Sequence, residues 1–298
     1  MTFTKRDRSI SADTLPLPSG AATAAKQLAD DHNVTVSSSA LPSGAATAVN
    51  QFIDPMLEIA RGNVSGMSHV NKFGENPDVV KNTTEDVWDG GGTYSFPATA
   101  LMTKMSQTTD QGDMQGETIE VQGLDASWDL VVQNVDLDDS NTETPVTLDT
   151  PLIRCFRMKV LANYVTTSPI RVHNDAENVD YAIIDTGNNQ TLMAIYTVPA
   201  EKTAYLTNYY ADTAPTGSGT KDPYAVKIKL WFADRDNSYE FQIKHEKGLI
   251  QDGAHSFQHF FKPYYKATQK TDIKISAFAS NDWNGHIHAG FDLILVDN

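Results

Sequence analysis

Short runs in which apolar and polar residues alternate fill the chain from about residue 85 to its end, and turn residues separate them. Side chains of a β-strand point alternately to its two faces, so a two-residue period is typical of strands with one buried face. The strands expected on this basis are residues 118–125, 128–137, 144–148, 153–161, 168–173, 181–184, 190–198, 203–211, 225–233, 239–246, 256–267, 271–279 and 286–296. Many short strands with almost no helical period predict an all-β body, a β-sandwich or jelly roll. The spacing is compatible with one large sandwich and with two small ones.

Turn-forming residues predict how some of these strands are connected. The strands that flank residues 138–141 (Asp-Asp-Ser-Asn) are expected to form a hairpin. Residues 88–97 indicate a glycine turn that leads into an aromatic edge strand, and residues 71–77 indicate a loop. Residues 212–224 contain the longest Gly/Ser stretch of the body, for which we expect an exposed loop.

The first fifty residues differ in character, because they contain an exact repeat. Leu-Pro-Ser-Gly-Ala-Ala-Thr-Ala occupies residues 17–24 and returns unchanged at residues 41–48. The segment is poor in large apolar side chains, so it cannot bury enough surface to offset the entropy lost on ordering. We therefore expect an extended arm that docks on a partner through two similar contacts. The candidate contact residues are Leu17, Pro18, Ser19, Gly20, Leu41, Pro42, Ser43 and Gly44.

A short helix is expected between this arm and the body. Ile53, Met56, Leu57 and Ala60 follow helical spacing, and Gly62 comes next as an end signal. The expected organisation is an arm over 1–50, a short helix and linker over 51–84, and a β-sandwich or jelly-roll body over 85–298.

The charge balance excludes some classes of partner. Lys and Arg number 23 against 38 Asp and Glu, which gives a net charge of −15. Phosphate binding requires a basic face, so neither nucleic acid nor an anionic membrane surface is expected as a partner. No long apolar run predicts a transmembrane helix, and no apolar stretch near Met1 predicts a secretory signal. The single cysteine, Cys155, lies in an alternating run and is expected to be a buried, inert thiol.

Two histidines are the candidate metal ligands. His286 and His288 fall on one face of an expected strand, which is a common metal-binding geometry. Zinc needs further ligands, for which Asp282, or His255 and His259, are available. No other spacing of metal ligands supports the site. We therefore interpret His286 and His288 as two exposed polar positions on a strand face, and we expect no metal and no cofactor.

Other polar or aromatic segments carry weaker signals. Residues 136–141 resemble a calcium loop in oxygen density but lack the glycine and the distal glutamate of an EF-hand, so a solvated hairpin tip is preferred. Trp283 lies in a polar turn and is a candidate glycan contact, whereas Trp128 and Trp231 are expected to pack in the core. Nucleophile elbows, phosphate-binding glycine loops and dinucleotide fingerprints are absent, so we expect no enzyme.

Several motifs resemble those of an uncharacterised family of tailed-bacteriophage virion proteins, many from marine phages. They are the arm repeat, Asn71-Lys72-Phe73-Gly74, residues 87–92 (Val-Trp-Asp-Gly-Gly-Gly), residues 119–125 (Ile-Glu-Val-Gln-Gly-Leu-Asp), residues 189–200 and residues 290–296. Glu201 stands where the family usually has a glycine after Pro-Ala. The resemblance covers residues 17 to 296, and the family has no catalytic residues to carry over.

The leading expectation is therefore a non-enzymatic phage structural protein, located in the virion and assembled in the host bacterial cytoplasm. Its partners would be other virion proteins, with homo-oligomers expected from virion symmetry. We favour a head decoration or minor capsid role. The alternatives are a tail-associated adaptor or fibre protein, and a carbohydrate-binding receptor module.

Overall fold

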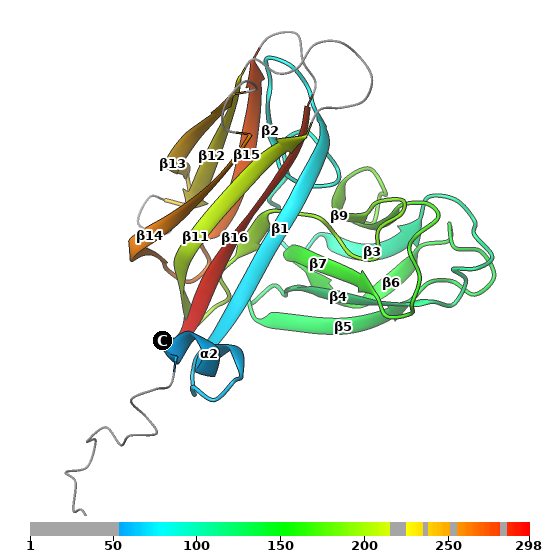
Figure 1. Ribbon diagram of the computed structural model, residues 1–298. Coiled ribbons are helices and arrows are strands. Elements are labelled where there is room, and N and C mark those ends of the chain that lie inside the picture. The colour runs from blue at the N-terminus through cyan, green and yellow to red at the C-terminus, as the bar shows by residue number, and fades with distance from the viewer. Residues whose placement is uncertain (1–53, 215–224, 235–237, 251–254, 281–284) are drawn as a thin grey trace, which may run out of the picture. The chain divides into compact units, whose positions relative to one another are not determined.

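The strands of the described residues pair into four antiparallel sheets, which form two sandwiches (Figure 1). The computed structural model describes residues 54–214, 225–234, 238–250, 255–280 and 285–298, and residues 54–298 form one compact unit. The two arm repeats, the glycines at 217 and 219, Asp282 and Trp283 lie outside the described residues.

The first sandwich has the strand order of a jelly roll. One sheet has the order β1 (Met67–Val79), β16 (Gly285–Asp297), β11 (Lys202–Ala214), β14 (Ser256–Ala267). The facing sheet has the order β10 (Ile195–Thr197), β15 (Asp272–Ser280), β12 (Ala225–Ala233), β13 (Phe241–Ile250), and β2 (Thr84–Asp86) also pairs with β15. Lettered B to I along the chain, with β2 and β10 together as C, the sheets read B-I-D-G and C-H-E-F, which is the double Greek key of a jelly roll.

The second sandwich is inserted within strand position C of the first, between β2 and β10. β2 pairs with residues 276–278 of β15 and β10 pairs with residues 272–274, so the chain leaves and re-enters the same strand position. Between these two points lie the sheet β6 (Val146–Leu152), β3 (Met102–Gln107), β8 (Ile170–His173), β9 (Asp180–Ile184) and the sheet β5 (Leu130–Asp136), β4 (Thr118–Leu124), β7 (Arg154–Val160). The body therefore consists of two nested sandwiches, which is one of the two arrangements left open by the strand spacing.

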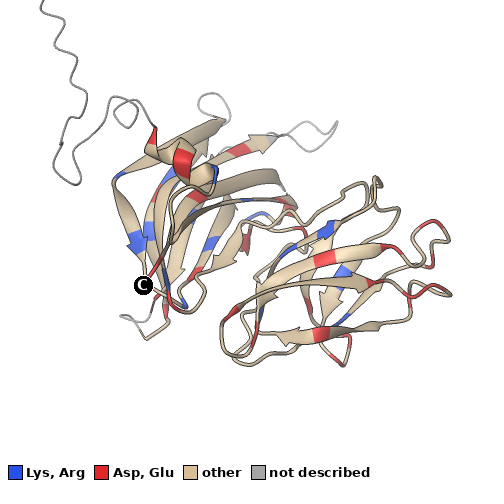
Figure 2. Ribbon diagram, turned by 90° about the horizontal axis from the view of Figure 1, so that it is seen from below, with Lys and Arg blue, Asp and Glu red and all other residues tan. Residues whose placement is uncertain are grey.

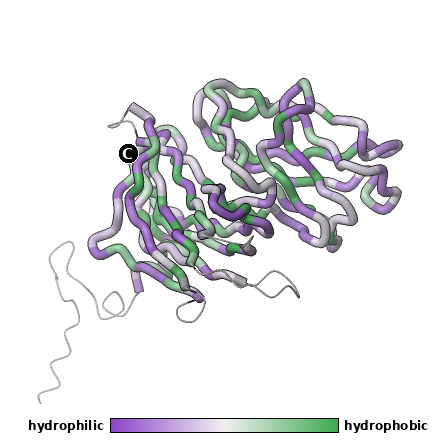
Figure 3. The backbone as a smooth tube through the Cα atoms, turned by 90° about the horizontal axis from the view of Figure 1, so that it is seen from above, coloured by the Kyte–Doolittle hydropathy of each residue, from purple (hydrophilic) through white to green (hydrophobic). Residues whose placement is uncertain are grey.

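Each sandwich has its own hydrophobic core. Along β16, Ile287, Ala289, Phe291 and Leu293 are buried between the two sheets of the jelly roll. A second cluster fills the inserted sandwich and includes Met102, Met105, Ile119 and Met158. Apolar segments recur along the strands of both (Figure 3). Cys155 is buried as predicted, and burial raises the pKa of its thiol to about 12.

A buried ion pair joins the two sandwiches. The guanidinium of Arg154 on β7 contacts both carboxylate oxygens of Asp272 on β15, with Nε–Oδ1 and Nη2–Oδ2 distances of 2.8 Å. Thr197 Oγ1 donates to the same carboxylate, and Arg154 Nη1 donates to the carbonyl of Pro97. Every charged group of this contact is thus hydrogen-bonded, as burial requires.

The short helix is present, but the predicted apolar face is wrong. α2 (Pro55–Ala60) begins at Asp54, whose Oδ1 accepts from the backbone N–H of Met56, and Gly62 follows it with a φ of 74°. Met56 and Leu57 are exposed, and the buried residue is Ile59. A helix of six residues makes fewer than two turns, so it does not build a continuous apolar stripe. No helix among the described residues is long and apolar enough to cross a membrane.

The loop expected at residues 71–77 is wrong, because β1 runs through it. Pro77 is tolerated there because β1 is an edge strand, where a missing N–H costs no ladder bond. Gly74 lies where the backbone of Met193 and Ala194 approaches, which is a packing requirement and not a turn. The β structure consequently begins at Met67, ahead of the boundary near residue 85.

Two connections also differ from the sequence prediction. The predicted hairpin across 138–141 is wrong, because β5 and β6 belong to opposite sheets of the inserted sandwich. The side chain of Gln133 links them instead by bonding both the N–H and the carbonyl of Thr150. Of the strand expected at 190–198, only residues 195–197 are a strand.

The aromatic edge strand expected at residues 93–97 is likewise wrong. Tyr94 donates its N–H to Asp86 Oδ2, and its ring is buried edge-on against Trp88. These aromatic residues therefore pack into the inserted sandwich without joining a ladder.

Candidate functional site

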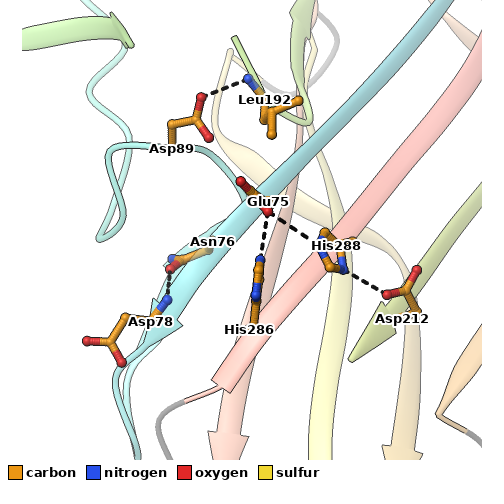
Figure 4. Close-up of polar contacts among 8 residues, drawn as sticks. All are labelled: Glu75, Asn76, Asp78, Asp89, Leu192, Asp212, His286 and His288. Carbon is orange, nitrogen blue, oxygen red and sulfur yellow. Dashed lines mark hydrogen bonds and ion pairs between the residues drawn. The ribbon is translucent and has the colours of Figure 1, made fainter. Parts of the chain in front are cut away.

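Three adjacent strands place four ionisable side chains in one group on the outward face of the β1-β16-β11-β14 sheet. In β16 the odd positions from 287 to 295 enter the core, so His286 and His288 point to the other face. Glu75 of β1 lies opposite His288, and Asp212 of β11 lies opposite His288 on the other side. The strand register alone thus aligns Glu75, His288 and Asp212 in one row (Figure 4).

The two imidazoles converge on a single carboxylate oxygen. His286 Nε2 lies 2.7 Å from Glu75 Oε2, and His288 Nε2 lies 3.3 Å from the same atom. His288 Nδ1 lies 2.9 Å from Asp212 Oδ1. The imidazole centroids are 4.4 Å apart. His288 is therefore held from both ring nitrogens by carboxylates on the two neighbouring strands.

These contacts shift the pKa values of the group in opposite directions. The hydrogen bond from His288, with that from His286, lowers the pKa of Glu75 to about 2. The hydrogen bond to Glu75, with that to Asp212, raises the pKa of His288 to about 9. In the absence of a competing cation, His288 is an imidazolium between two carboxylates at neutral pH.

Asp89 lies beside this group, and its pKa is shifted in the opposite direction from that of Glu75. Its Oδ2 accepts from the backbone N–H of Leu192 at 2.9 Å, while its Oδ1 is buried without a hydrogen-bond partner in the described part of the chain. Burial, together with the charge of Glu75, raises the pKa of Asp89 to about 8. A carboxyl in this setting is mostly protonated at neutral pH, so it adds little negative charge beside Glu75.

We expect His288→Gln to lower stability most in mildly acidic solution. A raised folded-state pKa means that the contribution of His288 is fully present below its ordinary pKa of 6.5 and is lost as the pH rises through about 9. The contribution also needs Glu75 ionised, which sets the acid limit near pH 2, where that carboxylate is protonated. Urea unfolding in the presence of EDTA, below pH 6.5 and above pH 9, measures the difference between wild type and variant.

His69→Gln is the matched control for this measurement. His69 is an exposed histidine on the outward face of β1, outside the group. Its substitution should cost little at either pH. A penalty for His288→Gln that is equal at the two pH values would contradict the ion-pair account.

The structure unites only part of the metal set considered from the sequence. His286 and His288 are together as predicted, but neither His255 nor His259 belongs to the group that could hold a metal ion, and His259 stacks on His245 at a centroid distance of 4.1 Å. Sequence reasoning missed Glu75, which fell in an expected loop, and Asp212, which fell at the start of another. A strand assignment for 67–79 would have revealed Glu75, because pairing with β16 places it opposite His288.

The remaining sequence candidates occupy structural positions. Asp138 Oδ1 accepts from the N–H groups of Ser140 and Asn141, so it caps its own turn. Trp128 lies in a turn with a φ of 71°, outside any strand, and its half-buried ring covers the guanidinium of Arg154 at 4.9 Å. Trp231 is half-buried on β12 and donates to Ser276.

A cavity of about 510 Å³ lies beside β1 and is lined in part by Lys72, Gln122 and Arg157. Lys72 donates to the carbonyl of Phe156 and is buried. Burial, with the nearby charge of Arg157, lowers the pKa of Lys72 to about 7. The amine of Lys72 in this cavity is therefore only partly protonated at neutral pH.

Comparison with known proteins yields only weak structural likenesses. No family model and no curated protein matches the sequence. A structure of the Gt strain of infectious bursal disease virus aligns with a TM-score of 0.20 and 10% identity, over 78% of this chain and 73% of that one. T=1 particles derived from the same virus align with a TM-score of 0.20 and 9% identity, over 83% and 80% of the two chains. Likenesses at this TM-score carry no argument about function.

Proposed function

We propose that the chain is a non-enzymatic structural component of a tailed-phage particle, anchored by residues 1–50 and presenting the two sandwiches. The observation that carries the proposal is the exact repeat at 17–24 and 41–48, which precedes a body with two hydrophobic cores of its own. Two identical segments can bind two equivalent sites, and the surfaces of symmetric assemblies present equivalent sites. The motifs that resemble phage virion proteins support the same role.

The charge distribution supports an inserted sandwich that faces solvent. Residues 97–190 contain 15 Asp and Glu against 5 Lys and Arg, so this segment carries −10 of the net charge of −15. Acidic residues recur along its loops (Figure 2). A surface with this charge repels nucleic acid and limits nonspecific association between neighbouring copies.

Deletion of residues 1–50 tests the anchoring role. We expect a folded, soluble body that no longer joins particles, because the deletion leaves both cores intact and removes both repeats. Circular dichroism checks the fold, and co-sedimentation with purified particles that lack the protein checks incorporation. Replacing residues 41–48 with a Gly/Ser sequence of equal length is the matched control for arm length, and it should weaken incorporation. Full incorporation of the truncated protein would show that the arm is not the anchor.

Within this proposal we favour a head decoration or minor capsid position. The copy number per particle distinguishes it from a tail adaptor or fibre. A number comparable with that of the capsid protein fits the head, whereas a small ring-like number fits the tail. Quantitative gel densitometry of purified virions against the capsid band measures it.

A further inference from the structure

We propose that Glu75, His286 and His288 bind a dication of the zinc class, with Asp212 orienting the imidazole of His288. This site is independent of the proposed virion role. The sequence argued against a metal because no spacing of Cys or His elsewhere in the chain supported a third ligand. Glu75 supplies that ligand, from a strand that the sequence did not reveal.

The ligand atoms already converge. One ring nitrogen of His286, one of His288 and a carboxylate oxygen of Glu75 lie within 4.8 Å of one another, the only such His/Cys/Asp/Glu group among the described residues. Zinc bonds nitrogen and oxygen at about 2.0–2.2 Å, so tetrahedral ligands lie about 3.3–3.5 Å apart. The His288–Glu75 separation of 3.3 Å already meets this value. The His286–Glu75 separation of 2.7 Å must widen by less than 1 Å, within the reach of a glutamate side chain.

Asp212 completes an arrangement typical of zinc sites. A histidine that binds metal through one ring nitrogen usually donates the other N–H to a carboxylate, which fixes the ring and its tautomer. Asp212 Oδ1 lies at 2.9 Å from His288 Nδ1, and this leaves Nε2 directed at Glu75 and His286. The carboxylates of Glu75 and Asp212 together balance the two charges of the cation.

The donor set determines the class of ion. Two imidazoles and one carboxylate suit zinc and its neighbours in the first transition row, whereas magnesium and calcium take oxygen ligands. The side chains of His286 and His288 are 29% and 41% exposed, so solvent reaches the group and water can provide a fourth ligand.

The place of the site in the fold suggests a structural role. Glu75 belongs to the edge strand β1, and the pairing of β1 with β16 shifts register just beyond it, between Asn76 and Val79. A metal held by both strands would clamp the edge strand where its ladder becomes irregular. The bound protein should therefore unfold at a higher temperature than the stripped protein.

Calorimetric titration of the full-length, EDTA-stripped protein with ZnCl₂ tests the proposal. We expect one saturable site per chain and a raised Tm. His286→Gln and Glu75→Gln should each weaken binding by at least about tenfold, and Asp212→Asn by about 10- to 100-fold. His69→Gln, on the same face of β1, should bind like the wild type, and MgCl₂ should give no saturable signal.

A spectroscopic readout separates loss of a ligand from loss of the fold. Co²⁺ in a site with nitrogen and oxygen ligands gives visible absorption bands that report its geometry, and these should appear with wild type and His69→Gln and vanish with His286→Gln. Circular dichroism in EDTA confirms that each variant is folded. Zn²⁺ binding by folded His286→Gln and Glu75→Gln with the affinity of the wild type, or no Zn²⁺ binding by the wild type, would overturn the proposal.

Discussion

Replacing Asp272 with alanine is expected to lower the free energy of unfolding by about 3–5 kcal/mol, because it leaves Arg154 as an uncompensated buried charge. Arg154 and Asp272 are 5% and 6% exposed, and the pair is bidentate. In this setting the cost comes less from the lost attraction than from the guanidinium that remains without a counter-charge. Urea denaturation of wild type and variant at one pH measures the difference.

The geometry also predicts which substitutions of the pair are tolerated. Arg154→Lys should be strongly destabilising as well, since the compact ammonium of lysine lacks the planar fork that reaches both oxygens of Asp272 and the carbonyl of Pro97 at once. Replacing both members with apolar residues of similar volume, Arg154→Met with Asp272→Leu, should cost less than either single change to alanine. This double variant distinguishes a buried-charge penalty from a general packing defect.

Asp175→Ala is the matched control on the surface. Asp175 pairs with Lys104 at 3.1 Å, but its side chain is 84% exposed. Water screens such a pair, so its loss should cost no more than about 1 kcal/mol. Equal losses of unfolding free energy for Asp175→Ala and Asp272→Ala would show that burial does not determine how much the Arg154–Asp272 pair contributes to stability.

Strict alternation made some strands predictable almost to the residue, and its absence concealed others. β12 and β14 begin and end where the pattern predicts, because each has one face in the core and one toward solvent. The pattern does not predict β3, and it predicts a loop over residues 71–77 of β1. In β1 the inward positions hold Lys72, Gly74 and Asn76, and the segments that contact Lys72 and Gly74 are distant in the sequence. A period-two pattern of hydrophobicity cannot appear where polar residues and glycine occupy the inner face.

The same reasoning explains which residues of the candidate site could be predicted from the sequence. His286 and His288 share a strand, so their spacing alone placed them on one face. Glu75 and Asp212 join them only through the order β1-β16-β11, a long-range pairing that local sequence does not contain. The insertion of one sandwich into the other is not predictable from the sequence for a similar reason. β2 and β10 have three residues each, which is too short for a pattern that would show that both pair with β15.

Gly74→Ala is expected to lower the free energy of unfolding by about 3 kcal/mol, the upper end of the usual cost of overpacking. A Cβ at Gly74 would lie 2.6 Å from both the Cα and the carbonyl carbon of Met193, and closer still to the backbone nitrogen of Ala194. These are backbone atoms, so rotating a side chain cannot relieve the clash. Ala194 is itself fixed, because its N–H donates to Val87 and its carbonyl accepts from Ile275.

Gly248→Ala is the matched control, because it adds the same methyl group to another strand. A Cβ at Gly248 on β13 meets no atom within 4 Å, and this glycine does not have a positive φ. Alanine there should leave stability within about 0.5 kcal/mol of wild type, or raise it slightly by restricting the unfolded chain. Urea denaturation of the two variants in parallel separates the close backbone approach at Gly74 from any general cost of placing alanine in a strand. If Gly74→Ala lowers the free energy of unfolding no more than Gly248→Ala does, the backbone of Met193 and Ala194 does not pack too closely on β1 to admit a methyl group at position 74.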